Sequence, residues 1–349
     1  MDKRGSHTHV LVIRLSAMGD VAMTVPVLQS ITATYPLLKV TVLTKKTFAP
    51  IFKGLGNVTV VVADVKKRHK GLIGLWRLYQ ELKKIQIDAV ADLHNVLRSR
   101  ILKNYFALDH IPVVYIDKGR EEKKALTRFK NKQFQQLKST HQRYADVFET
   151  LGFQINLSKV ELLRRKQLSE QVLGLVQLDA KKWIGIAPFA AHEGKKYPLH
   201  LIQEVIQALE NTSKYKILLF GGGPDETQQL ETLSDSYKNT LCMAGKLTLD
   251  QELELISNLD VMLSMDSGNA HLAANYGIPV VTLWGVTHPF AGFYPFGQPL
   301  TNALLANREQ YPLIPTSVYG NKMPKDYGRV MESIPTQKVI DKLIEILEA

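Results

Sequence analysis

The segment Ser264-Met-Asp-Ser-Gly-Asn-Ala-His271 brings a carboxylate, a hydroxyl and an imidazole together within eight residues. It follows an apolar strand and opens a helix, so the amides of residues 267–269 have no acceptor within that helix. Such amides, backed by the helix dipole, bind anionic groups such as a diphosphate. We therefore expect an anion site here, with Asp266 placed to bind a sugar hydroxyl. Taken singly, Ser267 is also a common helix cap and His271 a common buried histidine.

A second carboxylate, Asp20, ends the segment Arg14-Leu-Ser-Ala-Met-Gly-Asp20, which follows the first apolar strand. Gly19 allows a tight turn, and Asp20 then begins a helix at the carboxyl edge of the sheet, where open parallel sheets bind ligands. Asp20 is either a reactive carboxylate or a helix cap. The turn lacks the G-x-G-x-x-G pattern of dinucleotide sites, which weakens a dehydrogenase interpretation.

Two further strand-to-helix loops have residues suited to a nucleotide. Lys195 and Lys196, in Pro188-Phe-Ala-Ala-His-Glu-Gly-Lys-Lys-Tyr-Pro198, are either phosphate ligands or solvated lysines. The glycine-rich turn Phe220-Gly-Gly-Gly-Pro-Asp-Glu226 lets a ligand approach the backbone. The Asp225 or Glu226 carboxylate in it is suited to ribose hydroxyls, although helix capping explains either one equally well.

The elements that position these residues alternate between strand and helix, which predicts parallel sheets with helices on both faces. In the first half we expect strands at 10–15, 40–43, 58–62, 89–92 and 113–116, and helices at 21–34, 72–85, 96–106 and 141–151. In the second half we expect strands at 183–187, 215–220, 261–264 and 280–283, and helices at 199–209, 226–233, 249–257, 268–276 and 337–347. Residues 117–138 are predicted to be an exposed loop or surface helix, and 286–327 an irregular segment.

Charge divides the 349-residue chain. Residues 1–165 contain 29 Lys and Arg against 13 Asp and Glu, a net of +16, whereas residues 166–349 contain 15 against 20, a net of −5. A basic half is suited to a polyanion, whether nucleic acid, an anionic membrane surface or a phosphorylated substrate. The single cysteine, Cys242, excludes an internal disulfide. No apolar run approaches the ~20 residues of a membrane span, and residues 1–9 lack the apolar core of a signal peptide, so we expect a cytoplasmic protein.

Together these motifs resemble the ADP-heptose:lipopolysaccharide heptosyltransferases of glycosyltransferase family 9. The segment Ser16-Ala-Met-Gly-Asp20 is similar to the family's N-terminal signature, and Asp266-Ser-Gly-Asn-Ala-His271 to its more specific D-[ST]-G-x-x-H donor motif. The resemblance implies an α/β glycosyltransferase-B fold of two Rossmann-like domains whose parallel sheets face each other across a cleft. Residues 1–165 would then bind the acceptor, and residues 166–349, with a closing C-terminal helix, the nucleotide sugar.

The resemblance also implies an activity, the inverting transfer of heptose from a nucleotide diphosphate sugar, ADP-heptose, to an anionic, lipid-linked acceptor, the lipopolysaccharide inner core. Asp20 matches the family's base, and neither a cofactor nor a metal is expected. The donor residues implied are Lys195, Glu226, Leu247, Asp266, Ser267, Gly268 and His271. Basic residues suited to the acceptor are Lys66, Lys67, Arg68, Arg98, Arg120 and Lys123.

Three alternatives stay open. Ala190 and Ala191 stand where family members that use ADP-heptose commonly have hydroxyl residues, so a related transferase with another nucleotide sugar is one. A nucleotide-sugar epimerase of the same architecture is the second. Nucleic-acid binding, motivated only by a pI near 9.4, is not expected, because no aromatic stacking motif interleaves the basic residues. The basic half also predicts peripheral contact with an anionic inner membrane.

Overall fold

The computed structural model describes residues 8–349, so most of the segment used to argue against a signal peptide lies outside it. The chain forms two compact units. The first contains the residues up to Lys118 and Thr140–Leu163, and the second contains Gly119–Ser139 and Arg164–Ala349. The expected division at residue 165 lies close to the observed change at Leu163. Residues 119–139, however, belong to the second unit rather than the first.

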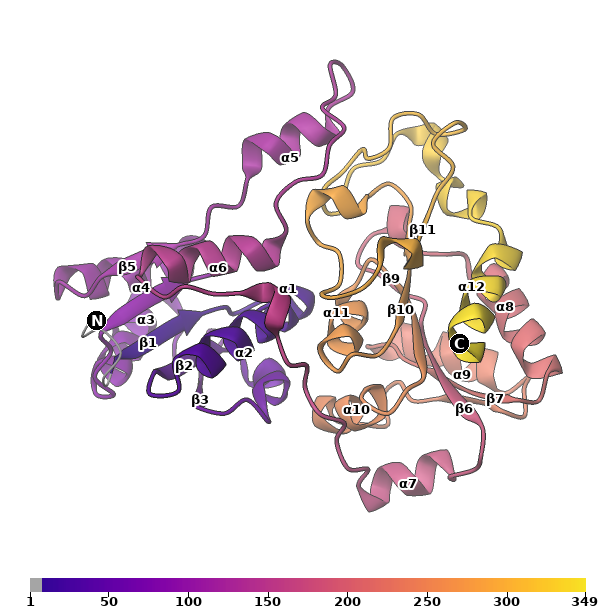
Figure 1. Cartoon of the computed structure of the whole chain (residues 1–349), viewed down its shortest axis with the longest axis horizontal. Helices are drawn as coiled ribbons and strands as arrows, with labels where there is room; N and C mark the ends of the chain where they lie inside the picture. Colours follow the sequence, from indigo (N-terminus) through magenta and orange to yellow (C-terminus); the bar gives the residue numbers. More distant parts are fainter. Residues whose placement is uncertain (1–7) are drawn as a thin grey trace. The chain divides into compact units, whose positions relative to one another are not determined.

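The first unit contains one parallel sheet with the strand order β3-β2-β1-β4-β5 (Figure 1). Its strands are β1 (His9–Ile13), β2 (Lys39–Thr44), β3 (Val58–Val62), β4 (Ala89–Asp92) and β5 (Val113–Tyr115). The strand order reverses direction between β1 and β4, and in open α/β sheets ligands bind at the carboxyl ends of the strands beside that point. Asp20 follows β1, so the topology places it at this reversal.

Helices enclose the first sheet: α1 (Met18–Ala22), α2 (Val25–Thr34), α3 (Gly71–Lys83), α4 (Leu97–Leu108) and α6 (Thr140–Thr150). Leu11 and Ile13 of β1 pack with Leu78 of α3 and Phe106 of α4 in one buried cluster. The single helix expected over 21–34 is two helices, because Pro26 lies in the first turn of α2 and supplies no amide to continue an earlier helix.

The second unit contains a six-stranded parallel sheet in the order β11-β10-β9-β6-β7-β8. Its strands are β6 (Lys182–Ala187), β7 (Tyr215–Leu219), β8 (Thr240–Cys242), β9 (Val261–Met265), β10 (Val280–Trp284) and β11 (Ala303–Leu305). This order is that of a dinucleotide-type Rossmann sheet, with its reversal between β6 and β9. Two Rossmann-like units with parallel sheets are therefore confirmed. The edge strands β8 and β11 were not expected from the sequence.

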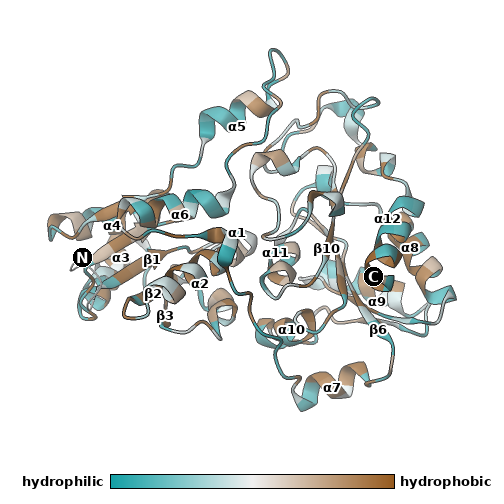
Figure 2. Ribbon diagram, in the orientation of Figure 1, coloured by the Kyte–Doolittle hydropathy of each residue, from teal (hydrophilic) through white to brown (hydrophobic). Residues whose placement is uncertain are grey.

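Seven helices surround this sheet within the described residues: α5 (Arg120–Thr127), α7 (Glu170–Val176), α8 (Leu199–Asn211), α9 (Pro224–Ser234), α10 (Leu249–Ile256), α11 (Gly268–Asn275) and α12 (Thr336–Glu348). Helices α8 and α12 pack on one face, where Val205 and Leu343 join Ile186 and Leu263 in the core. Hydrophobic and hydrophilic turns alternate along α12 and α8 in Figure 2, as expected of helices with one buried face.

Residues 119–139, which we call the inserted segment, are held to the second unit by apolar packing. Leu126 and Leu137 are buried with Ala291, and Phe134 packs against this cluster. The Leu137 amide donates to the Phe290 carbonyl at 2.9 Å. The sequence predicts an exposed segment here, but these few apolar side chains are enough to anchor it.

No helix among residues 8–349 combines the length and the apolar character needed to cross a bilayer.

Candidate active site

An ion pair lies at the carboxyl edge of the second sheet, beside its reversal. Lys195 follows β6, Asp266 follows β9, and the two strands are neighbours in the sheet. The Lys195 Nζ lies 3.0 Å from Asp266 Oδ2, and the two side chains are only 13% and 10% exposed. The structure thus joins two of the predicted donor residues and gives each a fixed partner.

Glycines hold the loop that carries Lys195. The Gly194 carbonyl accepts from the Val286 amide at 3.0 Å, which ties the loop to the end of β10. A Cβ atom at Gly285 would clash with that same carbonyl. Gly320, with φ +86°, lies so close to the Lys195 stem that a Cβ there would overlap it. These approaches limit where the ammonium group can lie.

The donor motif continues into α11, whose first residue is Gly268. Ser267 stands at the N-cap position, but its hydroxyl makes no capping bond and instead lies 3.0 Å from the Ser264 hydroxyl. The helix-cap role considered for this side chain is therefore wrong. The amides that open α11 remain directed along the helix axis toward the carboxyl edge, as an anion requires. His271 is buried one turn further on.

Glu226 closes the glycine-rich turn after β7. Its Oε2 accepts from the Gly222 amide at 2.8 Å, so its carboxylate supports the turn as well as standing at the start of α9. Gly223, with φ +90°, precedes the first residue of this helix. The position suits ribose hydroxyls, and the capping alternative is realised through the same side chain.

The loops after β6, β7 and β8 touch one another in sequence along this edge. A Cβ at Gly221 would lie 3.4 Å from Phe189 Cδ2, and one at Gly245 would lie 3.3 Å from Thr227 Cγ2. Leu247 lies beyond the last contact, where it lines a polar hollow of about 570 Å³ with Gln171 and other residues of α7 and α10. Donor residues therefore follow four adjacent strands, a span of about 14 Å at ~4.8 Å per strand.

Asp20 in the first unit is held by a buried arginine. Arg14 Nη2 lies 2.5 Å from Asp20 Oδ2, and Arg14 Nη1 donates to the Leu93 carbonyl at 2.7 Å. Burial disfavours the charged guanidinium, but Tyr144 and then Asp20 outweigh this and raise the Arg14 pKa. The Tyr144 hydroxyl also donates to the Asp20 carbonyl at 3.2 Å. The sequence analysis missed Arg14 as a functional residue, because it reads there only as a break in an apolar run.

The turn after β4 adds two buried polar groups on the other side of β1. Asp92 Oδ1 accepts from the amides of His94 and Asn95, at 3.0 and 2.8 Å. Asn95 has φ +43°, a left-handed conformation that asparagine tolerates. Burial, followed by Arg14 and Lys118, lowers the pKa of His94 to about 3, so its imidazole is neutral. Its Nδ1 and the second Asp92 oxygen are buried without a hydrogen-bond partner in the described structure.

The predicted acceptor residues do not form one group. Lys66, Lys67 and Arg68 are exposed in the turn after β3, and Arg98 is exposed at the start of α4. Arg120 and Lys123 lie instead on α5 of the second unit. Lys123 is buried, with its ammonium 4.2 Å from the centre of the Phe293 ring.

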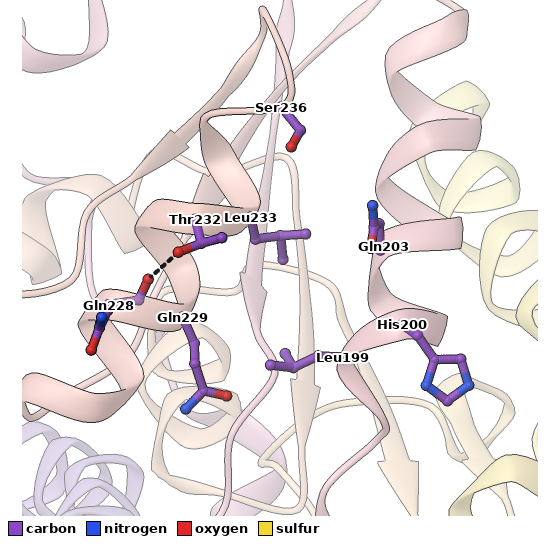
Figure 3. A pocket seen from close by; sticks show the side chains of 8 residues that line it. All are labelled: Leu199, His200, Gln203, Gln228, Gln229, Thr232, Leu233 and Ser236. Carbon is purple, nitrogen blue, oxygen red and sulfur yellow. Dashed lines mark hydrogen bonds between the residues drawn. The ribbon is translucent and has the colours of Figure 1, made fainter.

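Two other features lie apart from these residues. A hollow of about 460 Å³ between α8 and α9 is lined by Leu199, His200, Gln203, Gln228, Gln229, Thr232, Leu233 and Ser236 (Figure 3). None of the predicted donor or acceptor residues lines it. Across residues 8–349, no group of three or more His, Cys, Asp or Glu side chains has an arrangement suited to a metal ion.

Comparison with known proteins identifies relatives over nearly the whole chain. Lipopolysaccharide core heptosyltransferase OpsX of Haemophilus influenzae is 26% identical over 328 residues, which cover 93% of this chain and 88% of the relative. A solved glycosyl transferase family 9 structure from Veillonella parvula superposes with a TM-score of 0.74 at 20% identity, covering 99% and 98% of the two chains. Escherichia coli heptosyltransferase WaaC with ADP-2-deoxy-2-fluoro heptose gives 0.66 at 19% identity, covering 97% and 99%.

The structural similarities establish a shared fold. The sequence model of glycosyltransferase family 9 (heptosyltransferase) matches residues 75–325, which include the Lys195 loop, the glycine-rich turn and the donor motif. Asp20 lies outside the matched range, so its role depends on its own geometry. With most of its length matched, this chain belongs to glycosyltransferase family 9, the heptosyltransferase family.

Proposed function

We propose that the chain transfers heptose from ADP-heptose to the inner core of lipopolysaccharide, with inversion at the anomeric carbon. The observation that carries the proposal is the Lys195–Asp266 pair beside the opening amides of α11, within a chain of this family. The OpsX relative, a lipopolysaccharide core heptosyltransferase, supports the acceptor class. Membership of a transferase family also argues against the epimerase alternative.

In this proposal the second unit holds the donor. Lys195 and the amides of Gly268 and Asn269 stabilise the charge that develops on the leaving ADP, as preorganised donors do in other transfer reactions. The charge is balanced in this way without a metal ion. Asp266 orients the sugar, and Glu226 and the backbone near Leu247 hold the nucleoside. Ala190 and Ala191 leave the backbone amides of their loop to replace the missing hydroxyls.

Asp20 is the base. An acceptor hydroxyl attacks the anomeric carbon, the bond to the diphosphate breaks, and the hydroxyl proton passes to the Asp20 carboxylate. The sugar acquires oxocarbenium character as its bond to the leaving group lengthens, as in glycoside hydrolysis. Arg14 keeps the carboxylate in one orientation, since it binds Asp20 Oδ2 and the Leu93 carbonyl with different nitrogens.

Exposed cations supply acceptor binding. Lys66, Lys67, Arg68 and Arg98 belong to the first unit, and they are suited to the phosphates and acidic sugars of the acceptor. Arg120 is a separate contribution from the inserted segment. We also propose that the enzyme works in peripheral contact with an anionic membrane, because its acceptor is lipid-linked.

The test is Asp20→Asn, which keeps the shape of the side chain but removes its ability to accept the proton. We expect transfer to fall by roughly 10²–10⁴-fold, the usual contribution of a general base. ADP binding measured by calorimetry should stay within about twofold, since the residue serves the acceptor. EDTA should leave the wild-type rate unchanged.

A matched control is Glu149→Gln on α6 of the same unit, an exposed carboxylate. It should transfer at the wild-type rate. Wild-type-like transfer by Asp20→Asn would remove Asp20 as the base. A wild-type enzyme that binds ADP but forms no heptosylated product from ADP-heptose and the lipopolysaccharide core would contradict the proposed function itself.

A further inference from the structure

An exposed apolar surface lies at the beginning of α3. Leu72, Ile73 and Trp76 are 65%, 79% and 47% exposed. They stand at positions i, i+1 and i+4 and therefore share one side of the helix. A single exposed leucine is ordinary, but three adjacent large apolar side chains make a contiguous patch of the kind that marks interaction sites. We call these three residues the α3 patch.

The α3 patch is additional to the face by which α3 packs on its own unit. Leu75, Leu78 and Leu82 of the same helix are buried in the core beneath it. Trp76 is steadied by aromatic neighbours, with its ring centre 5.2 Å from that of Tyr79 and 5.1 Å from that of Tyr105. The patch is therefore presented by a rigid helix whose core contacts are already complete.

Positive charge borders the patch. Lys66, Lys67, Arg68 and Lys70 precede α3, Arg77 lies on it, and all five side chains are exposed. One of them, Arg68, is paired with Glu81 at 2.5 Å. The other four have no acidic partner in the described structure.

The basic turn is held against the helix rather than loosely attached. The Asp64 carboxylate accepts from the Lys67 amide at 3.1 Å, and Arg77 Nη1 donates to the Arg68 carbonyl at 3.4 Å. The turn comes so close to α3 that a Cβ at Gly74 would clash with the His69 backbone. Cations and apolar patch therefore form one surface with a fixed arrangement.

We propose that this surface docks on an anionic lipid bilayer, with the α3 patch inserted at the boundary between headgroups and acyl chains and the surrounding cations bound to headgroup phosphates. The inference deepens the proposed function, on which it rests for a lipid-linked acceptor. Interfacial helices combine these same two features, an apolar face and flanking basic residues. Tryptophan is also enriched at the membrane–water interface.

The charge distribution favours a membrane over the other occupants. A second copy of the chain would place the same cations opposite one another in a two-fold interface, with like charges in contact. An acidic saccharide would satisfy the cations but would leave Leu72, Ile73 and Trp76 in water. An anionic bilayer satisfies both.

Trp76 provides a direct readout. The chain has three tryptophans, and the other two, Trp183 and Trp284, are only 6% and 2% exposed. With vesicles of phosphatidylcholine and phosphatidylglycerol, we expect a blue shift of tryptophan emission and its quenching by brominated acyl chains. Vesicles of phosphatidylcholine alone should give a much smaller shift, because the cations then have no anionic partner. An unchanged emission spectrum with sedimented, vesicle-bound protein would overturn the insertion of the patch.

The variant test replaces the patch by Leu72→Ser, Ile73→Ser and Trp76→Ser together. Cosedimentation with the anionic vesicles should weaken by at least about tenfold, given the apolar area withdrawn from the lipid. The matched control is Leu37→Ser, Leu108→Ser and Leu178→Ser, three leucines that are 62%, 76% and 64% exposed on other surfaces. The control should bind vesicles like the wild type, and equal binding by both triple variants would refute the proposal.

Two further measurements separate the possible causes. Transfer to a lipid-free core oligosaccharide should be the same for both triple variants and the wild type, so its absence in the wild type would count against the proposed function and not against docking. Sedimentation without lipid should show the same oligomeric state for all three proteins. A wild-type dimer that the patch variant dissociates would assign the surface to a second copy instead.

Discussion

The two neighbouring lysines of the Lys195 loop have different surroundings, and this difference separates their roles. Lys195 lies against the Asp266 carboxylate with little exposure. Lys196 pairs with Glu193, three residues earlier in the same loop, and the Glu193 side chain is 76% exposed. Sequence alone offered both as phosphate ligands. The structure favours Lys195, because its partner belongs to the donor motif.

Replacing each lysine in turn tests this distinction. Lys195→Met should weaken ADP binding by roughly 10- to 100-fold, the equivalent of one or two charge-assisted hydrogen bonds. Lys196→Met should change the dissociation constant by less than about twofold, because exposed ion pairs contribute little. Calorimetric titration with ADP measures both, after thermal unfolding has shown that each variant folds. Equal losses in the two variants would contradict the assignment.

Some residues of the candidate site were predictable from type and spacing, and others were not. Asp266 and Lys195 were recognisable because they follow strands and precede helices. Arg14, Gly320 and His94 were not, because their roles depend on contacts that bring distant segments together. Gly320, for example, lies 125 residues from the Lys195 stem against which it packs.

At the scale of elements, the inserted segment shows how a few side chains decide where a polar stretch docks. Phe134 packs its ring against those of His288 and Phe290, each with centres 5.0 Å apart, and Arg308 lies 3.7 Å over its face. Lys132 Nζ donates to the Pro315 carbonyl at 2.7 Å and to the Leu313 carbonyl. Burial and then Arg308 lower the pKa of Lys132 to about 8.

Phe134→Ala should release this segment. We expect destabilisation by about 2–3 kcal/mol, below the value for a fully buried phenylalanine because Phe134 is only partly buried. Hydrogen exchange should show lost protection in peptides that cover 126–137 and 288–293. Phe129→Ala is the control, since Phe129 is 61% exposed in the same segment. Loss of protection in both variants alike would show that Phe134 is not the anchor.

The helix and strand alternation was predictable, but element pairing was not. The strands β4 and β9 read directly as apolar runs, whereas β8 and β11 have three residues each and lie at the edge positions of the sheet. Strands that short have too few residues to show a period. The segment 119–139 is mostly charged, so nothing in its composition says which unit its three apolar anchors will contact.

The whole molecule distributes its charge less unevenly than the linear sequence suggests. The inserted segment contributes seven basic and two acidic residues to the second unit. Counted by compact units, the first has 20 basic and 11 acidic residues, a net of +9, and the second 24 and 22, a net of +2. The first unit remains the more basic one, and it also contains the α3 patch.

Three buried titratable groups make the stability of the whole protein depend on pH. Burial and then Arg14 lower the pKa of His94 to about 3, and burial and then Arg308 lower that of His288 to about 4. The unfolded chain binds protons at both below pH 6.5 while the folded chain does not, so the free energy of unfolding falls with acidification. Glu252 opposes this effect, because burial raises its pKa to about 7 and the folded form then binds the proton first.

Between about pH 4.5 and 6.5 the two histidines outweigh the one glutamate, so we expect the free energy of unfolding to fall by about 1.4 kcal/mol per pH unit as the pH decreases. His94→Gln removes one destabilising proton and should make the profile nearly flat. Glu252→Gln removes the opposing proton and should make it about twice as steep. Urea unfolding followed by circular dichroism at several pH values measures the slopes. If His94→Gln keeps the wild-type slope, the imidazole is not held neutral by its surroundings, and the buried cluster formed by Arg14, Asp20 and His94 has a different charge state.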